Sequence, residues 1–424
     1  MHIALVSQEY PPETAHGGIG TQTYLKAHGL ASLGHQVHVL SCSVDEHRHL
    51  YRDGDVRVIR IPAWKQRFAL HTDAVQWLTY SVEVAAAIAE LHRHEPVDII
   101  DFPDWGSEGY VHLLNRAESD RTPAAVIHLH GPLAMFAHKL GWPNLNSEFY
   151  RTGRFMEETC LRLANAIFSS AHCSAQCCVD YYGLDIAKIP VLHTGVDLEL
   201  FRPGLRSKEA RPTIVFVGKL AESKGINTLV DAACSLVPQF PNLQLWLIGP
   251  SNQSTCERVA EKARAAGAPD LLVLKGFVDR IELPSHLCSA HVFAAPSRYE
   301  GGPGFVYLEA MACGVPVIGT TGSGATEVIR HGETGLLIPP DDTGSLAAAL
   351  AQLLSTPEQS ARLGDQARAY VEAEADSQTC LRALEQFYLS VIDRMETDTN
   401  KDKIRKARLV SQNAAANEAL NDFE

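Results

Sequence analysis

The chain has 424 residues, of which 46% are hydrophobic and 21% charged, an ordinary globular composition with room for two or three domains. The formal net charge of -13 excludes a general nucleic-acid binder, because such a protein needs a basic surface. No run approaches the roughly 18 apolar residues of a transmembrane helix, and the apolar start over 1–7 has no basic region before it, so we expect a soluble, cytoplasmic protein.

The first half of the chain alternates short apolar runs with longer helical patterns. Helices are expected over 18–33 and 72–93. The expected strands are 2–7, 36–41, 56–61, 97–101, 124–130 and 166–169. Strands that alternate with helices predict a parallel sheet that is covered on both faces.

The same alternation restarts after a polar segment, 201–212, whose prolines and glycine are typical of a linker. The second set of expected strands is 213–218, 243–248, 271–274, 291–295 and 315–319. Beyond about residue 366 the pattern is helical and strand-free. We therefore predict an α/β protein with two Rossmann-like, doubly wound domains.

The chain turns polar from Thr397, with a basic cluster over 401–408. We interpret this cluster as a solvated or frayed tail, with a weak peripheral membrane contact or a partner contact as the alternative. The ten cysteines are scattered, and several lie in apolar segments where a free thiol behaves as a small hydrophobe. This usage predicts a reducing compartment and no disulfide framework.

The most informative segment is 297–318, which reads as a strand end, a glycine-rich loop, a helix and another strand. The loop leads into a helix amino end, where free N–H groups and the positive end of the dipole attract anions. Glu309 lies within this helix. A glutamate can accept hydrogen bonds from two vicinal hydroxyls, such as those of a ribose.

Several other motifs accompany this segment in a fixed order. They are Tyr10-Pro11-Pro12 with Gly17-Gly18, Leu33-Gly34-His35-Gln36-Val37, His128-Leu129-His130-Gly131, Gly195-Val196-Asp197 with Phe201 and Pro203, Val217-Gly218-Lys219-Leu220 with Lys224-Gly225, and Gly332-Glu333-Thr334-Gly335-Leu336-Leu337 with Asp341. Together they resemble the large retaining glycosyltransferase family 4, also called group 1, and the resemblance covers nearly the whole chain.

The resemblance implies the GT-B fold, in which the two domains face each other across a cleft. It places an acceptor-side domain over 1–205, a nucleotide-sugar-binding domain over 206–385, and a helix with a polar tail over 386–424. It implies transfer of a sugar from a nucleoside diphosphate sugar to a saccharide, glycoconjugate or natural-product acceptor, with retention of configuration. The nucleotide sugar and the acceptor are the expected partners, and no essential cofactor, metal or nucleic acid is expected.

The same resemblance implies roles for individual residues. The expected roles are catalysis for Glu300 and His130, diphosphate binding for Gly17, Gly18, Lys219 and Lys224, sugar binding for Gly301, Gly302 and Gly304, ribose binding for Glu309, and acceptor contact for Asp101 and Trp105. The two lysines follow a predicted strand end, which is where ligands bind in open α/β sheets. For Asp101 and Trp105 a turn with an aromatic plug is the alternative.

One feature departs from the family pattern. The family usually shows two glutamates separated by seven residues, whereas eight residues separate Glu300 from Glu309. Read back from Glu309, the usual position of the first glutamate holds Gly301. Because the loop has three glycines, it can absorb an extra residue without strain, and we expect Glu300 to keep its role.

Other interpretations of single motifs are weaker. Gly18-Ile19-Gly20 is no dinucleotide fingerprint, because Thr23 replaces the third glycine. We assign no metal to His128 with His130, which lack a third ligand at useful spacing, or to the structural helix over 172–178. At the level of function, a nucleotide-sugar 2-epimerase on the same fold and a binding protein without turnover remain as rivals.

Overall fold

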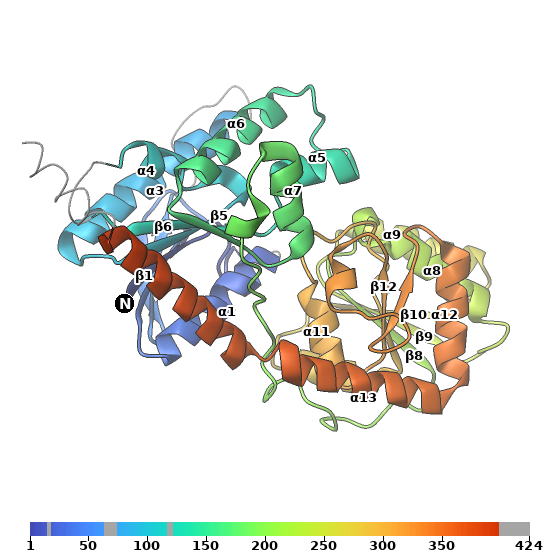
Figure 1. Cartoon of the computed structure of the whole chain (residues 1–424). Helices are drawn as coiled ribbons and strands as arrows, with labels where there is room; N and C mark the ends of the chain where they lie inside the picture. Colours follow the sequence, from blue (N-terminus) through green and yellow to red (C-terminus); the bar gives the residue numbers. More distant parts are fainter. Residues whose placement is uncertain (15–17, 63–73, 117–121, 398–424) are drawn as a thin grey trace, which may run out of the picture.

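The protein is described by a computed structural model, which covers residues 1–14, 18–62, 74–116 and 122–397 (Figure 1). As the sequence predicted, it is an α/β protein with two domains, each built around a largely parallel sheet. No helix within these ranges is long and apolar enough to cross a membrane.

The first domain contains a seven-stranded sheet in the order β3-β4-β2-β1-β5-β6-β7. Its strands are β1 (His2–Val6), β2 (Gln36–Cys42), β3 (His49–Asp53), β4 (Val56–Ile61), β5 (Ile99–Pro103), β6 (Ala124–Leu129) and β7 (Ala166–Ser169). All neighbours are parallel except β3, which pairs antiparallel with β4. The six expected strands are confirmed. The sequence missed β3, an edge strand whose residues are mostly exposed and so lack an apolar pattern.

Helices cover both faces of this sheet, as its buried strands require. They are α1 (Gly18–Ser32), α3 (Ala74–His94), α4 (Tyr110–Leu114), α5 (Leu133–Leu140), α6 (Glu148–Leu163) and α7 (His172–Tyr182), with short 3₁₀ turns η1 (Trp105–Ser107) and η2 (Ile186–Lys188). One core includes residues of α3, α6 and α7, and the other includes residues of α1.

The second domain contains a six-stranded parallel sheet in the order β10-β9-β8-β11-β12-β13. Its strands are β8 (Thr213–Val217), β9 (Gln244–Ile248), β10 (Leu272–Gly276), β11 (Val292–Ala294), β12 (Val317–Thr320) and β13 (Leu336–Ile338). The five expected strands are confirmed. The sequence placed β13 in a loop motif, because a three-residue strand carries almost no periodicity.

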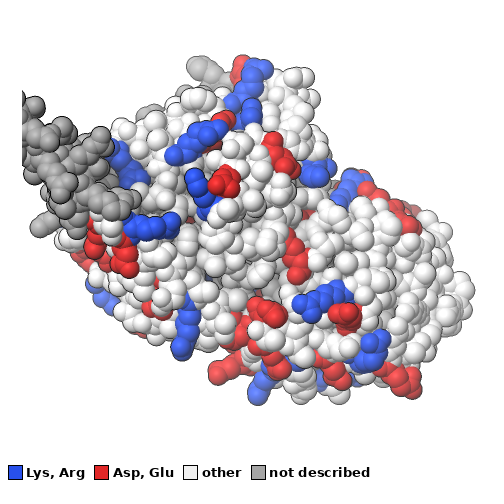
Figure 2. Space-filling view, in the orientation of Figure 1, with Lys and Arg blue, Asp and Glu red and all other residues white. Residues whose placement is uncertain are grey.

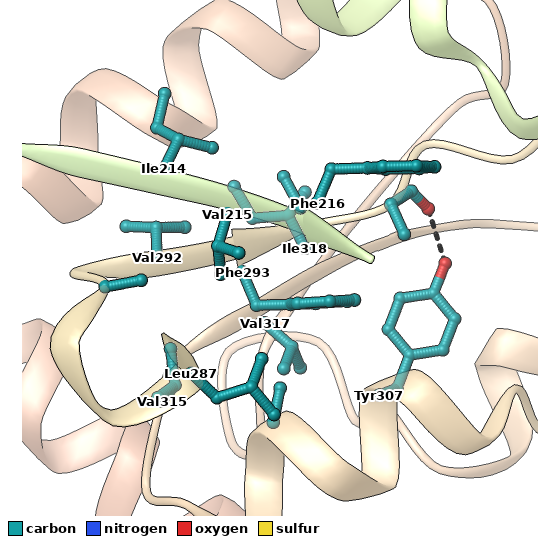
Figure 3. Packing of buried hydrophobic residues seen from close by; sticks show 14 of the residues in the cluster. Ile214, Val215, Phe216, Leu287, Val292, Phe293, Tyr307, Val315, Val317 and Ile318 are labelled. Carbon is teal, nitrogen blue, oxygen red and sulfur yellow. Dashed lines mark hydrogen bonds between the residues drawn. The ribbon is translucent and has the colours of Figure 1, made fainter. Parts of the chain in front are cut away.

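The helices of the second domain connect these strands. They are η3 (Glu222–Lys224), α8 (Ile226–Leu236), α9 (Gln253–Ala265), α10 (Leu283–Ser289), α11 (Phe305–Ala312), η4 (Gly324–Glu327), α12 (Thr343–Ser355) and α13 (Pro357–Glu374). Figure 3 shows how α11 is fixed to this sheet. The Tyr307 ring packs edge-on against Phe293, and its hydroxyl donates to the Ala295 carbonyl at 2.5 Å.

The last described helix, 377–397, crosses back to the first domain, where it appears as the dark red helix near α1 (Figure 1). Leu381, Leu384, Tyr388 and Val391 of this helix belong to the same core as α1. The two chain crossings between the domains lie side by side. The Val196 amide donates to the Ala375 carbonyl at 2.8 Å. The expected boundaries at residues 205 and 385 stay predictions.

Charges are mixed over the molecular surface. On the face in Figure 2, Lys and Arg side chains are interspersed with Asp and Glu and form no continuous basic area. The basic cluster 401–408 lies outside the described residues.

Candidate active site

The carboxyl end of β6 and the loop after β11 meet between the two domains. The Gly301 carbonyl accepts a hydrogen bond from the Ser174 hydroxyl of α7 at 2.5 Å. A Cβ atom at Gly301 would overlap the end of Met135 and would lie 3.4 Å from the His130 carbonyl oxygen. The glycine-rich loop of the second domain therefore lies directly against His130 and α7 of the first.

Lys224 and Glu300, expected in separate roles, form an ion pair. The Lys224 Nζ lies 2.8 and 2.9 Å from the two Glu300 carboxylate oxygens, and the Ser297 hydroxyl donates to the same carboxylate at 2.6 Å. Gly225, the residue after Lys224, lets the backbone pack closely against Pro296. It has a φ of +71°, and a Cβ atom there would overlap the Pro296 carbonyl oxygen. Only glycine combines that conformation with that contact.

The other expected diphosphate-binding groups lie at strand and helix ends. Lys219 is exposed in the turn that follows β8. Gly18 is the exposed first residue of α1, and Gly17 lies outside the described residues. At this same helix end the Gly20 amide donates to the Glu9 carboxylate at 3.3 Å, so one of the N–H groups is already paired with an acidic side chain.

Glu309 is buried in α11 with only 4% of its surface exposed. Arg280 donates to its carboxylate at 2.5 Å. Burial raises the pKa of Glu309, and the charge of Arg280 opposes that shift. The Arg280 guanidinium also lies over the Phe201 ring, 4.9 Å from its centre. The sequence contained no signal for Arg280, since it lies 29 residues from Glu309 outside any motif.

His130 follows the end of β6. Its buried Nδ1 has no hydrogen-bond partner among the described residues. Burial lowers the pKa of His130 well below its usual value, with a smaller effect from Lys26, so the ring is neutral near pH 7. Its ring lies 3.9 Å from that of His128, centre to centre. A neutral imidazole can donate a hydrogen bond from one nitrogen and accept one at the other.

Asp104 holds the loop that carries His130. Its carboxylate accepts hydrogen bonds from the amides of His130, Gly131 and Trp105 at 3.0, 3.1 and 2.8 Å. Burial nevertheless raises the pKa of Asp104 to about 6. The sequence singled out Asp104 together with Asp101 and Trp105, as part of a turn or as an acceptor contact, and did not predict that it anchors the loop of His130.

The two expected acceptor residues have different surroundings. Asp101 is buried and paired with Lys26 at 2.5 Å and with the Tyr388 hydroxyl, so the acceptor contact predicted for it gains no support from its position. Trp105 is half-buried in an aromatic group. It contacts Trp77, Phe136 and the 57% exposed Trp142, with ring centres 5.4–6.0 Å apart. This cluster is compatible with an aromatic plug and equally with a surface that contacts the acceptor.

The amino end of α7 provides a further contact between the domains. The amides of His172 and Cys173 donate to the Glu327 carboxylate at 2.8 and 3.0 Å. Negative charge at a helix amino end is favourable. With the bond from Ser174 to Gly301, this turn joins the first domain to both η4 and the glycine-rich loop. The segment 172–178 is helical, as expected, and lies within α7.

Two facing α/β domains, with a glycine-rich loop and a Lys–Glu pair between them, define a GT-B glycosyltransferase. Residues 16–200 match the family model described as Glycosyltransferase Family 4. Residues 197–370 match the model described as Glycosyl transferases group 1. The chain belongs to the group 1 glycosyltransferases and is an enzyme of that class.

Individual proteins are similar over most of the chain. A glycogen synthase of Mycobacterium tuberculosis is 26% identical over 92% of this chain and 95% of its own length. A GDP-mannose-dependent alpha-(1-6)-phosphatidylinositol monomannoside mannosyltransferase of the same species is 29% identical over 88% and 94%. The sucrose-phosphate synthase structure from Thermosynechococcus elongatus has the same fold. Its TM-score is 0.80 at 23% identity, over 92% of this chain and 99% of that one.

Proposed function

We propose that this enzyme transfers a sugar from a nucleoside diphosphate sugar to a saccharide, glycoconjugate or natural-product acceptor, with retention of anomeric configuration. The observation that carries the proposal is the Lys224–Glu300 pair, which lies where the loop of the second domain meets the first. A relative that is GDP-mannose-dependent by name supports a nucleotide-sugar donor. Retention is what the resemblance to the family implies.

Lys224 and Glu300 have separate roles once the donor binds. The diphosphate attracts Lys224 away from Glu300, because it carries more negative charge than a carboxylate. Lys224, exposed Lys219 and the amides at the start of α1 then stabilise the charge that develops on the leaving diphosphate. Glu300, released from its partner, stabilises the positive charge that develops on the reacting sugar.

The remaining residues orient the two substrates. We propose that Glu309 binds the ribose hydroxyls, that His130 contacts a sugar hydroxyl, and that the amides over 301–304 cradle the sugar. Trp105 with its aromatic neighbours would contact the acceptor. The acceptor hydroxyl loses its proton to the leaving phosphate.

A panel of nucleotide sugars tests the proposal in two steps. A thermal-shift screen first identifies the donor, since a ligand at 100 times its Kd stabilises by about 2.7 kcal/mol. Labelled donor is then incubated with and without candidate acceptors. Transfer needs the acceptor, a 2-epimerase forms its product without one, and a binding protein gives neither product. Epimer without acceptor, or binding with no product, would contradict the proposal.

We also propose a cytoplasmic location. The ten cysteines are free in the structure, and a reducing compartment keeps such thiols free. A weak membrane contact through 401–408 would bring the enzyme to a lipid-linked acceptor, and vesicle sedimentation of the chain with and without 398–424 tests it.

A further inference from the structure

Two histidines lie together at the end of the first sheet that is remote from the cleft. His2 opens β1, and the parallel register places Ala4 beside His38 of β2. Alternate residues of a strand share a face, so His2 and His38 project on the same side of the sheet. Both are buried, and the His2 Nε2 lies 2.8 Å from the His38 Nδ1.

A neighbouring carbonyl determines the protonation of His2. Its Nδ1 lies 2.8 Å from the Pro96 carbonyl oxygen, which can only accept a hydrogen bond, so Nδ1 carries the proton. In the neutral ring Nε2 then carries the lone pair, which accepts a hydrogen bond from the His38 Nδ1–H at 2.8 Å and would be turned to a metal ion if one bound. A backbone carbonyl that orients the second ring nitrogen is the usual support of a metal-binding histidine.

A carboxylate completes the cluster. Glu95 follows the end of α3, and single ligand atoms of His2, His38 and Glu95 all lie within 4.8 Å of one another. The Glu95 carboxylate also accepts from Arg57 at 2.6 Å and from Gln36. The charge of Arg57 opposes a cation here, whereas Glu95 and the nearby Asp98, which accepts from the His2 amide at 2.7 Å, favour one.

We propose that His2, His38 and Glu95 bind one Zn²⁺ ion, with water as the fourth ligand. Two imidazole nitrogens and a carboxylate oxygen are donors that Zn²⁺ accepts in tetrahedral geometry at about 2.0–2.2 Å. His38 then carries its proton on Nε2 and coordinates through Nδ1. The ion links β1, β2 and the end of α3, and its role is structural. The proposal does not depend on the proposed donor or acceptor.

Metal binding by the full chain tests this directly. The protein is prepared without a polyhistidine tag, treated with a chelator, and titrated with Zn²⁺ by calorimetry. We expect one ion per chain and a higher Tm with Zn²⁺. Co²⁺ in its place should give the visible absorption of a tetrahedral site. His38→Ala and Glu95→Gln should each weaken binding at least about tenfold. His47→Ala, an exposed histidine outside the cluster, is the matched control and should bind as wild type.

Two results would overturn the proposal. One is wild-type protein that binds no Zn²⁺ stoichiometrically in the micromolar range. The other is unchanged affinity in a folded His38→Ala protein, which would leave the pair as a hydrogen bond between histidines. If His38→Ala does not fold, Glu95→Gln decides, because it keeps both imidazoles and the buried end of the sheet, and unchanged affinity in that variant overturns the proposal equally.

Discussion

Lys224 and Glu300 form an ion pair, with the Lys224 Nζ within 2.9 Å of both carboxylate oxygens. The side chain of Glu300 is 16% exposed and that of Lys224 is 36% exposed. The partly buried carboxylate is thus paired with a more accessible cation. Under the proposed function, an arriving diphosphate would meet that cation first and would have to displace Glu300 from it.

Lys224→Ala should weaken the binding of a nucleoside diphosphate about ten- to a hundredfold, since a charged hydrogen bond contributes on the order of 1.5–3 kcal/mol. The substitution also leaves the Glu300 carboxylate without its partner, which repels the ligand further. Calorimetry measures the affinity. Lys262→Ala is the control, because Lys262 pairs with Asp231 at 2.6 Å elsewhere in the same domain. An unchanged Kd for Lys224→Ala would exclude the clamp.

Glu300→Gln should lower kcat by about 10²-fold or more, with donor affinity much less affected. Glutamine keeps the shape of the side chain and the Ser297 contact, but it cannot stabilise positive charge on the sugar. Steady-state kinetics with saturating acceptor and calorimetry of the donor separate the two effects. Near-normal turnover would remove Glu300 from catalysis and leave the loop amides over 301–304 as the main contributors.

Glu309→Gln should abolish the preference for an intact ribose. Wild type should bind a nucleoside diphosphate more tightly than its dideoxyribose analogue by roughly 1 kcal/mol or more. The variant should bind the two forms alike, because a neutral amide accepts less strongly and no longer pairs with Arg280. Competition binding of the two ligands measures the difference. A variant that discriminates as well as wild type would show that Glu309 does not contact the ribose.

Ser174→Ala should lower kcat about fivefold, because one neutral hydrogen bond contributes about 1 kcal/mol. In the wild type, the Ser174 hydroxyl bonds to the Gly301 carbonyl and so holds the loop next to Glu300 against α7. The affinity for the free nucleoside diphosphate should stay within about twofold, since Ser174 contacts none of the proposed diphosphate- or ribose-binding residues. Ser235→Ala removes a hydroxyl that bonds only locally, to the Ala232 carbonyl of α8, and should leave kcat unchanged. Equal kcat values for the two variants would contradict the tether.

His112 should make the fold sensitive to mild acid. Burial lowers its pKa to about 4, and Arg116 adds to the shift, whereas the unfolded chain takes up the proton near pH 6.5. The free energy of unfolding should therefore fall as the pH is lowered from about 6.5 to 4, by no more than about 3 kcal/mol from this residue. Urea unfolding at several pH values should show a shallower decline for His112→Phe. Parallel curves for variant and wild type would disprove the assignment.

The sequence was sufficient to predict a feature where the residues that form it lie close together in the chain. Buried parallel strands have continuous apolar runs, and the segment around Glu300 and Glu309 contains its loop, helix and carboxylates within one motif. The sequence was insufficient where the interacting residues are far apart in the chain. Ser174 contacts Gly301 across 127 positions, and neither Arg280 nor Glu327 belongs to a recognisable pattern. The same limit applies to Asp101, whose partners Lys26 and Tyr388 come from opposite ends of the chain.

The helix 377–397 determines the order in which the two domains can complete their folding. During synthesis the strands of the first domain emerge early, but Leu384 and Tyr388, which close one of its cores, emerge only after the whole second domain. Until then the buried pair of Lys26 and Asp101 lacks the Tyr388 hydroxyl. The second domain, whose core is continuous in sequence from 196 to 375, can complete itself first. Although it comes first in the chain, the amino-terminal domain is therefore the last to complete its core.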